Sequence, residues 1–314
     1  MSSIRTAIDE YLTLRRGLGF KLLQEGRWLA RFASFLERHR SARVTTRLAL
    51  EWATQPTHAQ PAHLAHRLSV LRGFARYQAA RDPRTEVPVV GLLPGRYHRK
   101  PPYLYTDDEL RRLLGAAERL PSTTGLRAQT YATLLGLLAV SGLRISEAVG
   151  LDRDDVELDE GVLTVRRTKF GKSRLVPVHG STRQALGRYA SFRDRLWPKP
   201  VTTGFFVGEH GGRLTANVVE ITFVKLSKSV GLRGRDDHRG PRLHDLRHRF
   251  AVRVLLDWYR AGADVEHHLP TLSTYLGHAH VTDTYWYLSA VPELMAIVTA
   301  RLERGRPYRG GRSQ

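Results

Sequence analysis

The sequence predicts a mainly α-helical protein with one small β-hairpin, divided into an N-terminal helical domain and a mixed α/β domain. Apolar residues recur at helical spacing through most of the 314 residues. Only residues 161–178 alternate as a pair of strands does. Four prolines and two glycines interrupt the pattern within residues 87–105, and they predict the boundary between the two domains.

Residues 1–90 predict a bundle of short helices. One apolar stripe begins at Ile4 and a second, rich in aromatic residues, begins at Trp28. Thr45 or Thr46 is the expected N-cap of a third helix, and Pro61 is the expected first residue of a fourth. The faces expected to point outward are rich in arginine and suit a DNA clamp better than a catalytic unit. The residues expected to contact DNA are Arg15, Arg16, Arg67, Arg72 and Arg76, together with Arg99 and Lys100 in the following segment.

A linker is expected over residues 91–105, a second domain over residues 106–290, and a C-terminal helix with a basic tail over residues 291–314. The second domain begins at the capping box "TDDE", Thr106 to Glu109. The hairpin "GVLTVRRTKFGKSRLVPV" turns at "KFGKS". Helices are expected at about residues 182–196, at 215–230 and from residue 244 onward.

The charge balance indicates a polyanionic partner. The formal net charge is +20, and residues 1–100 hold 18 Lys and Arg against 7 Asp and Glu. Such an excess favours nucleic acid, because bound cations release the counterions condensed on it. The longest apolar run, Ala132–Val140, is too short to cross a bilayer. The absence of cysteine excludes disulfides, thiolate nucleophiles and cysteine-based zinc sites. We expect a cytoplasmic, DNA-associated protein.

Four stretches of the second domain contain groups suited to phosphate chemistry. They are "SGLRISEAVGL", "RRTKFGKSRLVPV", "HDLRH" and "LGHAHVTDTYWYL". Each alone has an ordinary explanation: Arg144 and Glu147 are spaced for a local ion pair, and lysines at a hairpin tip are commonly solvated. In "HDLRH", His244 and Arg247 share one helical face.

Taken together, in order and spacing, these stretches resemble the tyrosine recombinase (phage integrase) family. The resemblance covers residues 106 to about 290, and the basic N-terminal half resembles the core-binding domain of that family. One departure is a segment between Arg247 and His278 that is longer than is usual there. The catalytic residues that the resemblance implies are Arg144, Lys169, His244, Arg247, His278 and Tyr287.

The chemistry of a phosphodiester under attack accounts for this set. Two arginines can bind the non-bridging oxygens as preorganised forks. Tyrosine is a poor nucleophile at neutral pH because its pKa is near 10, so cations and a base such as His244 would favour the phenolate. We expect Lys169 to protonate the leaving 5′-oxygen, His278 to bind the phosphate, and Glu147 to orient Arg144 or His244. A 3′-phosphotyrosine link would store the bond energy, so no ATP, metal or other cofactor is expected.

Several alternatives stay open on the sequence. Tyr285 and Tyr287 lie ~200° apart on a helix, so both cannot face one phosphate; family spacing favours Tyr287 and leaves Tyr285 and Trp286 as packing residues. Lys172 is the fallback for Lys169. Four histidines at 267, 268, 278 and 280 lack the ordered spacing of a zinc site.

Three functions are consistent with this chemistry or this fold. The first is a site-specific recombinase that acts on double-stranded DNA as a tetramer or with a related recombinase. The second is a type IB topoisomerase, which relaxes DNA as a monomer. The third is an architectural DNA-binding protein without catalysis. No membrane partner is expected, because no lipidation motif, signal peptide or spanning segment is present.

Overall fold

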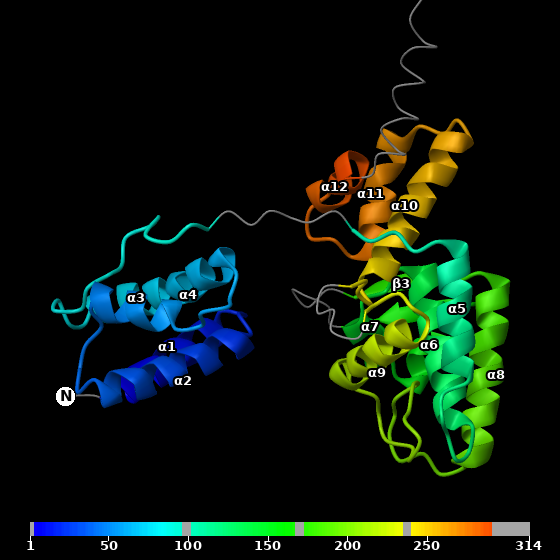
Figure 1. Cartoon of the computed structure of the whole chain (residues 1–314), viewed down its shortest axis with the longest axis horizontal. Coiled ribbons are helices and arrows are strands. Elements are labelled where there is room, and N and C mark those ends of the chain that lie inside the picture. Colours follow the sequence, from blue (N-terminus) through cyan, green and yellow to red (C-terminus); the bar gives the residue numbers. More distant parts are fainter. Residues whose placement is uncertain (1–2, 96–101, 167–172, 235–239, 291–314) are drawn as a thin grey trace, which may run out of the picture. The chain divides into compact units, whose positions relative to one another are not determined.

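The computed structural model describes residues 3–95, 102–166, 173–234 and 240–290 and divides the chain into two compact units, residues 1–100 and 101–314 (Figure 1). Each unit has its own apolar core. The prediction of a mainly helical protein with a small antiparallel sheet is confirmed. Within the described residues, no helix has the length and apolar character needed to span a membrane.

The first unit is a helical bundle whose aromatic residues interlock. Its helices are α1 (Ile4–Gly17), α2 (Leu23–Arg38), α3 (Thr46–Thr54) and α4 (Pro61–Ala79). Thr45 caps α3 by accepting a hydrogen bond from the backbone N–H of Leu48 at 3.3 Å. Phe32 of α2 lies edge-on to Trp52 of α3, and both are buried. The core of this unit therefore forms from the stripes that the sequence predicts.

The expectation that Arg67 points outward is wrong. Its side chain is buried, donates a hydrogen bond to the carbonyl of Trp52 at 2.8 Å, and lies 3.8 Å from the centroid of the Trp52 ring. The aliphatic stem and planar head of arginine suit such a stack, in which Nη2 donates to a backbone carbonyl while the buried Nε has no hydrogen-bond partner among the described residues. Helical spacing alone had assigned Arg67 to the solvent face.

The second unit combines helices with a small sheet. Its helices are α5 (Asp107–Glu118), α6 (Leu126–Ser141), α7 (Ile145–Gly150), α8 (Gly180–Leu196), α9 (Ala216–Ser229), α10 (Asp245–Arg260), α11 (Val265–Leu276) and α12 (Thr282–Ala290), with a 3₁₀ turn at Arg153–Asp155. The strands β1 (Val156–Glu157), β2 (Val162–Val165) and β3 (Arg174–Pro177) pair antiparallel in that order. The two-residue β1 was not predicted, since it is too short to show alternation.

The apolar run that the sequence contains forms the centre of this unit. It lies in α6, which packs against α5, α8 and α10. The chain then leaves α6 through Gly142, whose φ of +61° is the left-handed conformation that glycine adopts without a Cβ clash. Gly277, with φ +69°, ends α11 in the same way. These two helix ends supply the carbonyls around which the candidate site forms.

Candidate functional site

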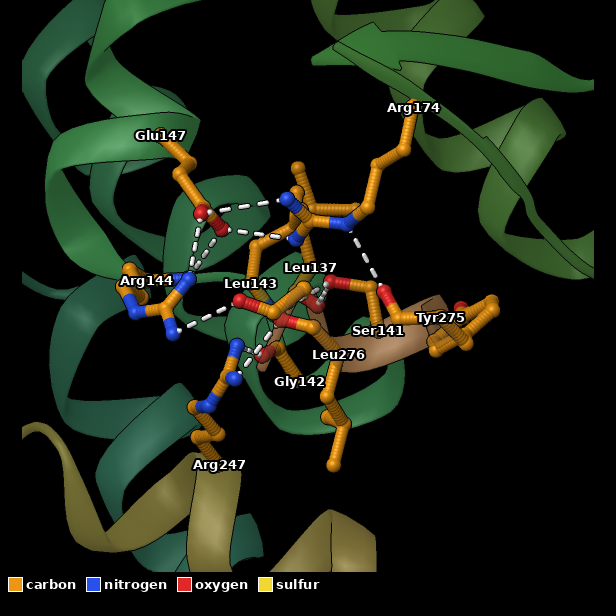
Figure 2. A network of polar contacts seen from close by, with 11 residues as sticks. Leu137, Ser141, Gly142, Leu143, Arg144, Glu147, Arg174, Arg247, Tyr275 and Leu276 are labelled. Carbon is orange, nitrogen blue, oxygen red and sulfur yellow. Dashed lines mark hydrogen bonds and ion pairs between the residues drawn. The ribbon is translucent and has the colours of Figure 1, made fainter. Parts of the chain in front are cut away.

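The ends of α6 and α11, the start of α7 and the first turn of α10 meet in one polar network (Figure 2). Figure 2 shows Arg144 and Arg247 reaching toward backbone carbonyls at these ends, with the Glu147 carboxylate between Arg144 and Arg174. Four of the six residues expected to be catalytic lie on these elements or next to them: Arg144, His244, Arg247 and His278.

Arg247 is a buried cation that the fold holds in place with carbonyls. Its side chain is 2% exposed, and its two Nη atoms donate to the carbonyls of Gly142 at 2.6 Å and Leu276 at 2.7 Å. Burial, followed by the charge of Arg144, lowers its pKa to about 10. Within the described ranges it has no carboxylate partner. Since a guanidinium has five N–H groups, Arg247 retains donors for an anion.

Arg144 is fixed by a carboxylate and a carbonyl. It is the N-cap of α7, and its Nη1 donates to Glu147 at 2.8 Å while its Nη2 donates to the carbonyl of Gly277 at 3.1 Å. Glu147 also receives two hydrogen bonds from Arg174, at 2.8 and 3.2 Å. Burial opposes ionisation of Glu147, but the bonds from Arg174 and Arg144 outweigh it and lower the pKa to about 2. The carboxylate is therefore charged at neutral pH.

His244 stands at the start of α10 as its N-cap. Its ring is solvent-exposed at the surface, yet the pKa of the imidazole is lowered to about 4, first by the protein atoms that displace water around it and then by Arg247. At neutral pH the ring is therefore uncharged, and it is able to accept a proton.

Tyr287 lies on α12 between two histidines. Its side chain is 1% exposed, and its hydroxyl is 2.9 Å from Nδ1 of His248. The ring of His278 lies nearly parallel to that of Tyr287, with the centroids 6.4 Å apart, and Nδ1 of His278 is 2.8 Å from the hydroxyl of the buried Thr284. Tyr285, in contrast, is 45% exposed, so the prediction that it is a packing residue is wrong.

The remaining predicted site residues fall into two groups. Lys169, Lys172, Arg99 and Lys100 lie outside the described residues. In the first unit Arg16 and Arg76 are exposed, whereas Arg72 donates to the carbonyls of Pro88 and Val89. Arg15 stacks over the ring of Phe20 at 4.0 Å.

Sequence reasoning missed three residues of the site and one cluster in the first unit. The missed site residues are Arg174, His248 and Thr284. His248 was detectable, because it follows His244 by one helical turn in "HDLRH". In the first unit, Arg31 and Arg38 of α2 line a pocket with the buried Arg67, and no described carboxylate pairs with any of the three.

Comparisons with known proteins agree on one family. The profile of the phage integrase family matches residues 104–293. A putative integrase/recombinase of Sinorhizobium fredii, y4rB, is 51% identical over 97% of this chain and 98% of its own length. The tyrosine recombinase XerC of Azotobacter vinelandii is 32% identical over 81% of this chain and 76% of its own length.

Solved structures share the fold at low sequence identity. The integrase of the Tn1549 transposon, in complex with transposon right end DNA, superimposes with a TM-score of 0.65 at 19% identity, covering 97% of this chain and 99% of that one. A lambda integrase dimer bound to a COC′ core site gives a TM-score of 0.62 at 17% identity, covering 100% of this chain and 81% of that one.

Proposed function

The chain belongs to the phage integrase family, and on this basis we propose that it cuts and rejoins double-stranded DNA at specific sites through a covalent 3′-phosphotyrosine intermediate. The observation that carries the proposal is the buried Arg247, which is held by two carbonyls, stands near Arg144 and has no carboxylate partner among the described residues. A buried guanidinium without a carboxylate partner destabilises the folded protein, and binding of an anion such as phosphate offsets this cost.

The arginines act on the phosphate. In the attack the non-bridging oxygens gain negative charge, and guanidiniums already fixed by backbone and carboxylate groups stabilise that charge without reorganising. Arg144 and Arg247 serve this role because their remaining N–H groups are not consumed by their anchors. His278 adds a third contact to the phosphate, oriented by Thr284.

Tyr287 is the nucleophile. Its oxygen attacks the phosphorus, the bond to the 5′-oxygen breaks, and the phosphate remains on the 3′ end as a tyrosyl ester. The phenolic proton passes to the neutral imidazole of His244, a role that its lowered pKa supports; His248, which contacts the Tyr287 hydroxyl, lies between them, with its ring centroid 4.7 Å from that of His244. Lys169 protonates the departing 5′-oxygen. Attack of a 5′-hydroxyl on the ester reverses these steps, so that neither metal, ATP nor another cofactor takes part.

The structural neighbours suggest which partners this chain has. One structural neighbour is a lambda integrase tetramer bound to a Holliday junction, and another is XerH bound to its palindromic difH substrate. We propose that this chain likewise pairs two DNA duplexes as a tetramer, of its own kind or with a related recombinase, in the cytoplasm. Residues 291–314 lie outside the described residues, but their sequence holds Leu294, Ile297 and Leu302 close to one helical stripe, and we propose that this stripe docks on a neighbouring protomer.

A nicked duplex tests the proposal. Cleavage next to the nick releases a short 5′-hydroxyl strand, which traps the protein on DNA as an adduct stable in SDS. An adduct excludes the architectural role, and strand exchange between two duplexes excludes a topoisomerase. Absence of any adduct on duplexes selected for binding would overturn the proposed reaction.

A further inference from the structure

Arg174 is the first residue of β3, and its side chain reaches into the site from the sheet (Figure 2). It is 10% exposed and makes three hydrogen bonds to the protein. We propose, building on the function above, that Arg174 is a positioning residue: through Glu147 and the turn that ends α11, it holds Arg144 and Arg247 at the spacing that the phosphate requires.

The first route runs through Glu147. Both oxygens of this carboxylate are shared, since Oε1 accepts from Arg144 and Arg174 and Oε2 accepts from Arg174 and the backbone N–H of Arg144. The carboxylate is only 7% exposed, so water does little to hold it. Without Arg174, only Arg144 would remain to orient the Glu147 carboxylate. Glu147 would then hold the Arg144 guanidinium less rigidly.

The second route runs through the turn Tyr275–Gly277. Nε of Arg174 donates to the carbonyl of Tyr275 at 2.8 Å. The next two carbonyls of this turn receive the two phosphate-binding arginines, Leu276 from Arg247 and Gly277 from Arg144. The Arg174 guanidinium also packs on Gly277 so closely that a Cβ there would lie 2.6 Å from Nη1. Thus every protein group that Arg174 binds is itself bound to, or adjacent to, an anchor of a phosphate-binding arginine.

Both routes require arginine in particular. The planar fork reaches both oxygens of Glu147 while Nε points to a different element, a geometry that a lysine ammonium does not reproduce. Each of the three guanidinium nitrogens of Arg174 donates a hydrogen bond to the protein, as a residue that supports the site without contacting DNA would do.

The test compares Arg174→Gln and Arg174→Lys with a matched control, Arg213→Gln. Arg213 binds the carbonyls of Val149 and Gly150 at the other end of α7 and pairs with Asp152, so it stabilises the same helix away from the phosphate. Trapped cleavage is measured at saturating full-length protein, with duplex affinity and melting temperature recorded for each variant.

We expect Arg174→Gln to slow cleavage by about 10²-fold, the usual effect of misplacing a reacting group by about 1 Å. Duplex affinity should stay within about twofold of wild type, because phosphate contacts elsewhere dominate binding. Arg174→Lys should recover part of the rate, and Arg213→Gln at an equal folded fraction should cleave normally. An equal loss in Arg174→Gln and Arg213→Gln would overturn the proposal and leave Arg174 a residue of general stability.

Two further readouts separate positioning from other roles. Arg174 lowers the pKa of Glu147, whose charge acts on both Arg144 and Arg247. Loss of Arg174 should therefore raise this pKa, and the acid limb of the plot of cleavage rate against pH should move to higher pH. A substrate with sulfur as the 5′-leaving atom needs no proton at that atom, and it should not rescue Arg174→Gln. Rescue by sulfur, or an unmoved acid limb, would overturn the route through Glu147. Failure of the wild type to cleave would instead overturn the proposed function.

Discussion

Replacing Arg247 by methionine tests whether the fold keeps a buried guanidinium in order to bind phosphate. The change keeps the apolar stem while removing the planar head, its charge and its two hydrogen bonds to the carbonyls of Gly142 and Leu276. We expect the DNA-free protein to fold with nearly unchanged stability and to lose both cleavage and its response to small anions.

The magnitudes follow from the burial of Arg247. Its pKa falls from 12.5 to about 10, and at ~1.36 kcal/mol per unit this opposes the charged form by about 3 kcal/mol. The methionine variant avoids that cost but leaves two carbonyls without a donor, at about 1–3 kcal/mol each where water does not replace it. The two effects nearly cancel. Removing one donor from an oxyanion site typically slows the reaction by about 10²–10³-fold.

The assay combines trapped cleavage with thermal melting in sulfate and in chloride at equal ionic strength. Sulfate stabilises proteins in general, so the informative quantity is the difference between variants. We expect sulfate to raise the melting temperature of the wild type more than that of Arg247→Met, because only the wild type binds the anion between its arginines.

Arg247→Lys serves as the control that keeps the charge but lacks the planar fork, and we expect intermediate values in both measurements. An identical sulfate response in wild type and Arg247→Met would show that Arg247 does not bind the anion, as would a methionine variant that cleaves within about threefold of wild type.

Three other predictions concern parts of the chain beyond this pair. The double variant Arg31→Ala, Arg38→Ala should bind duplex DNA more weakly. The slope of log affinity against log salt concentration should become shallower by up to about 2, roughly 0.9 per lost phosphate contact. An unchanged slope would show that this pocket does not contact DNA. Lys169→Ala should slow cleavage by about 10²–10⁴-fold and be rescued by the sulfur substrate, and rescue of Lys172→Ala instead would reassign the acid. Truncation after Ala290 should weaken paired-duplex complexes more than single-duplex binding on the same gel, and equal loss of both would show that residues 291–314 pack on their own domain.

Residue type and spacing were enough to predict the helical class, the hairpin and the capping box at Thr106, because each depends on local sequence. The two arginines of "SGLRISE" and "HDLRH" came instead from the resemblance to the family, and the structure brings Arg144 and Arg247 into one polar network. Arg174 could not be found in this way. It occupies an ordinary strand position, and its importance arises from contacts with residues 27 and 101 positions away.

The two errors have a common physical origin. Helical periodicity indicates on which face a side chain lies but not how far a long side chain reaches, so it predicts a solvent-exposed Arg67, although this residue stacks on Trp52. Helical phase turns Tyr285 away from Tyr287 and so predicts a packing residue, but that side of α12 faces solvent, while Tyr287 is buried. In both cases the packing of neighbouring helices, rather than the local pattern, decides exposure.

Identifying the amino acid that carries the DNA after trapped cleavage shows whether Tyr287 is the nucleophile. The adduct formed on a nicked duplex is digested with protease and nuclease, and the nucleotide-bearing peptide is sequenced by mass spectrometry. We predict a 3′-phosphate esterified to Tyr287, no adduct with Tyr287→Phe, and an undiminished adduct with Tyr285→Phe. A nucleotide attached to any other residue, or an adduct that persists in Tyr287→Phe, would show that Tyr287 is not the nucleophile.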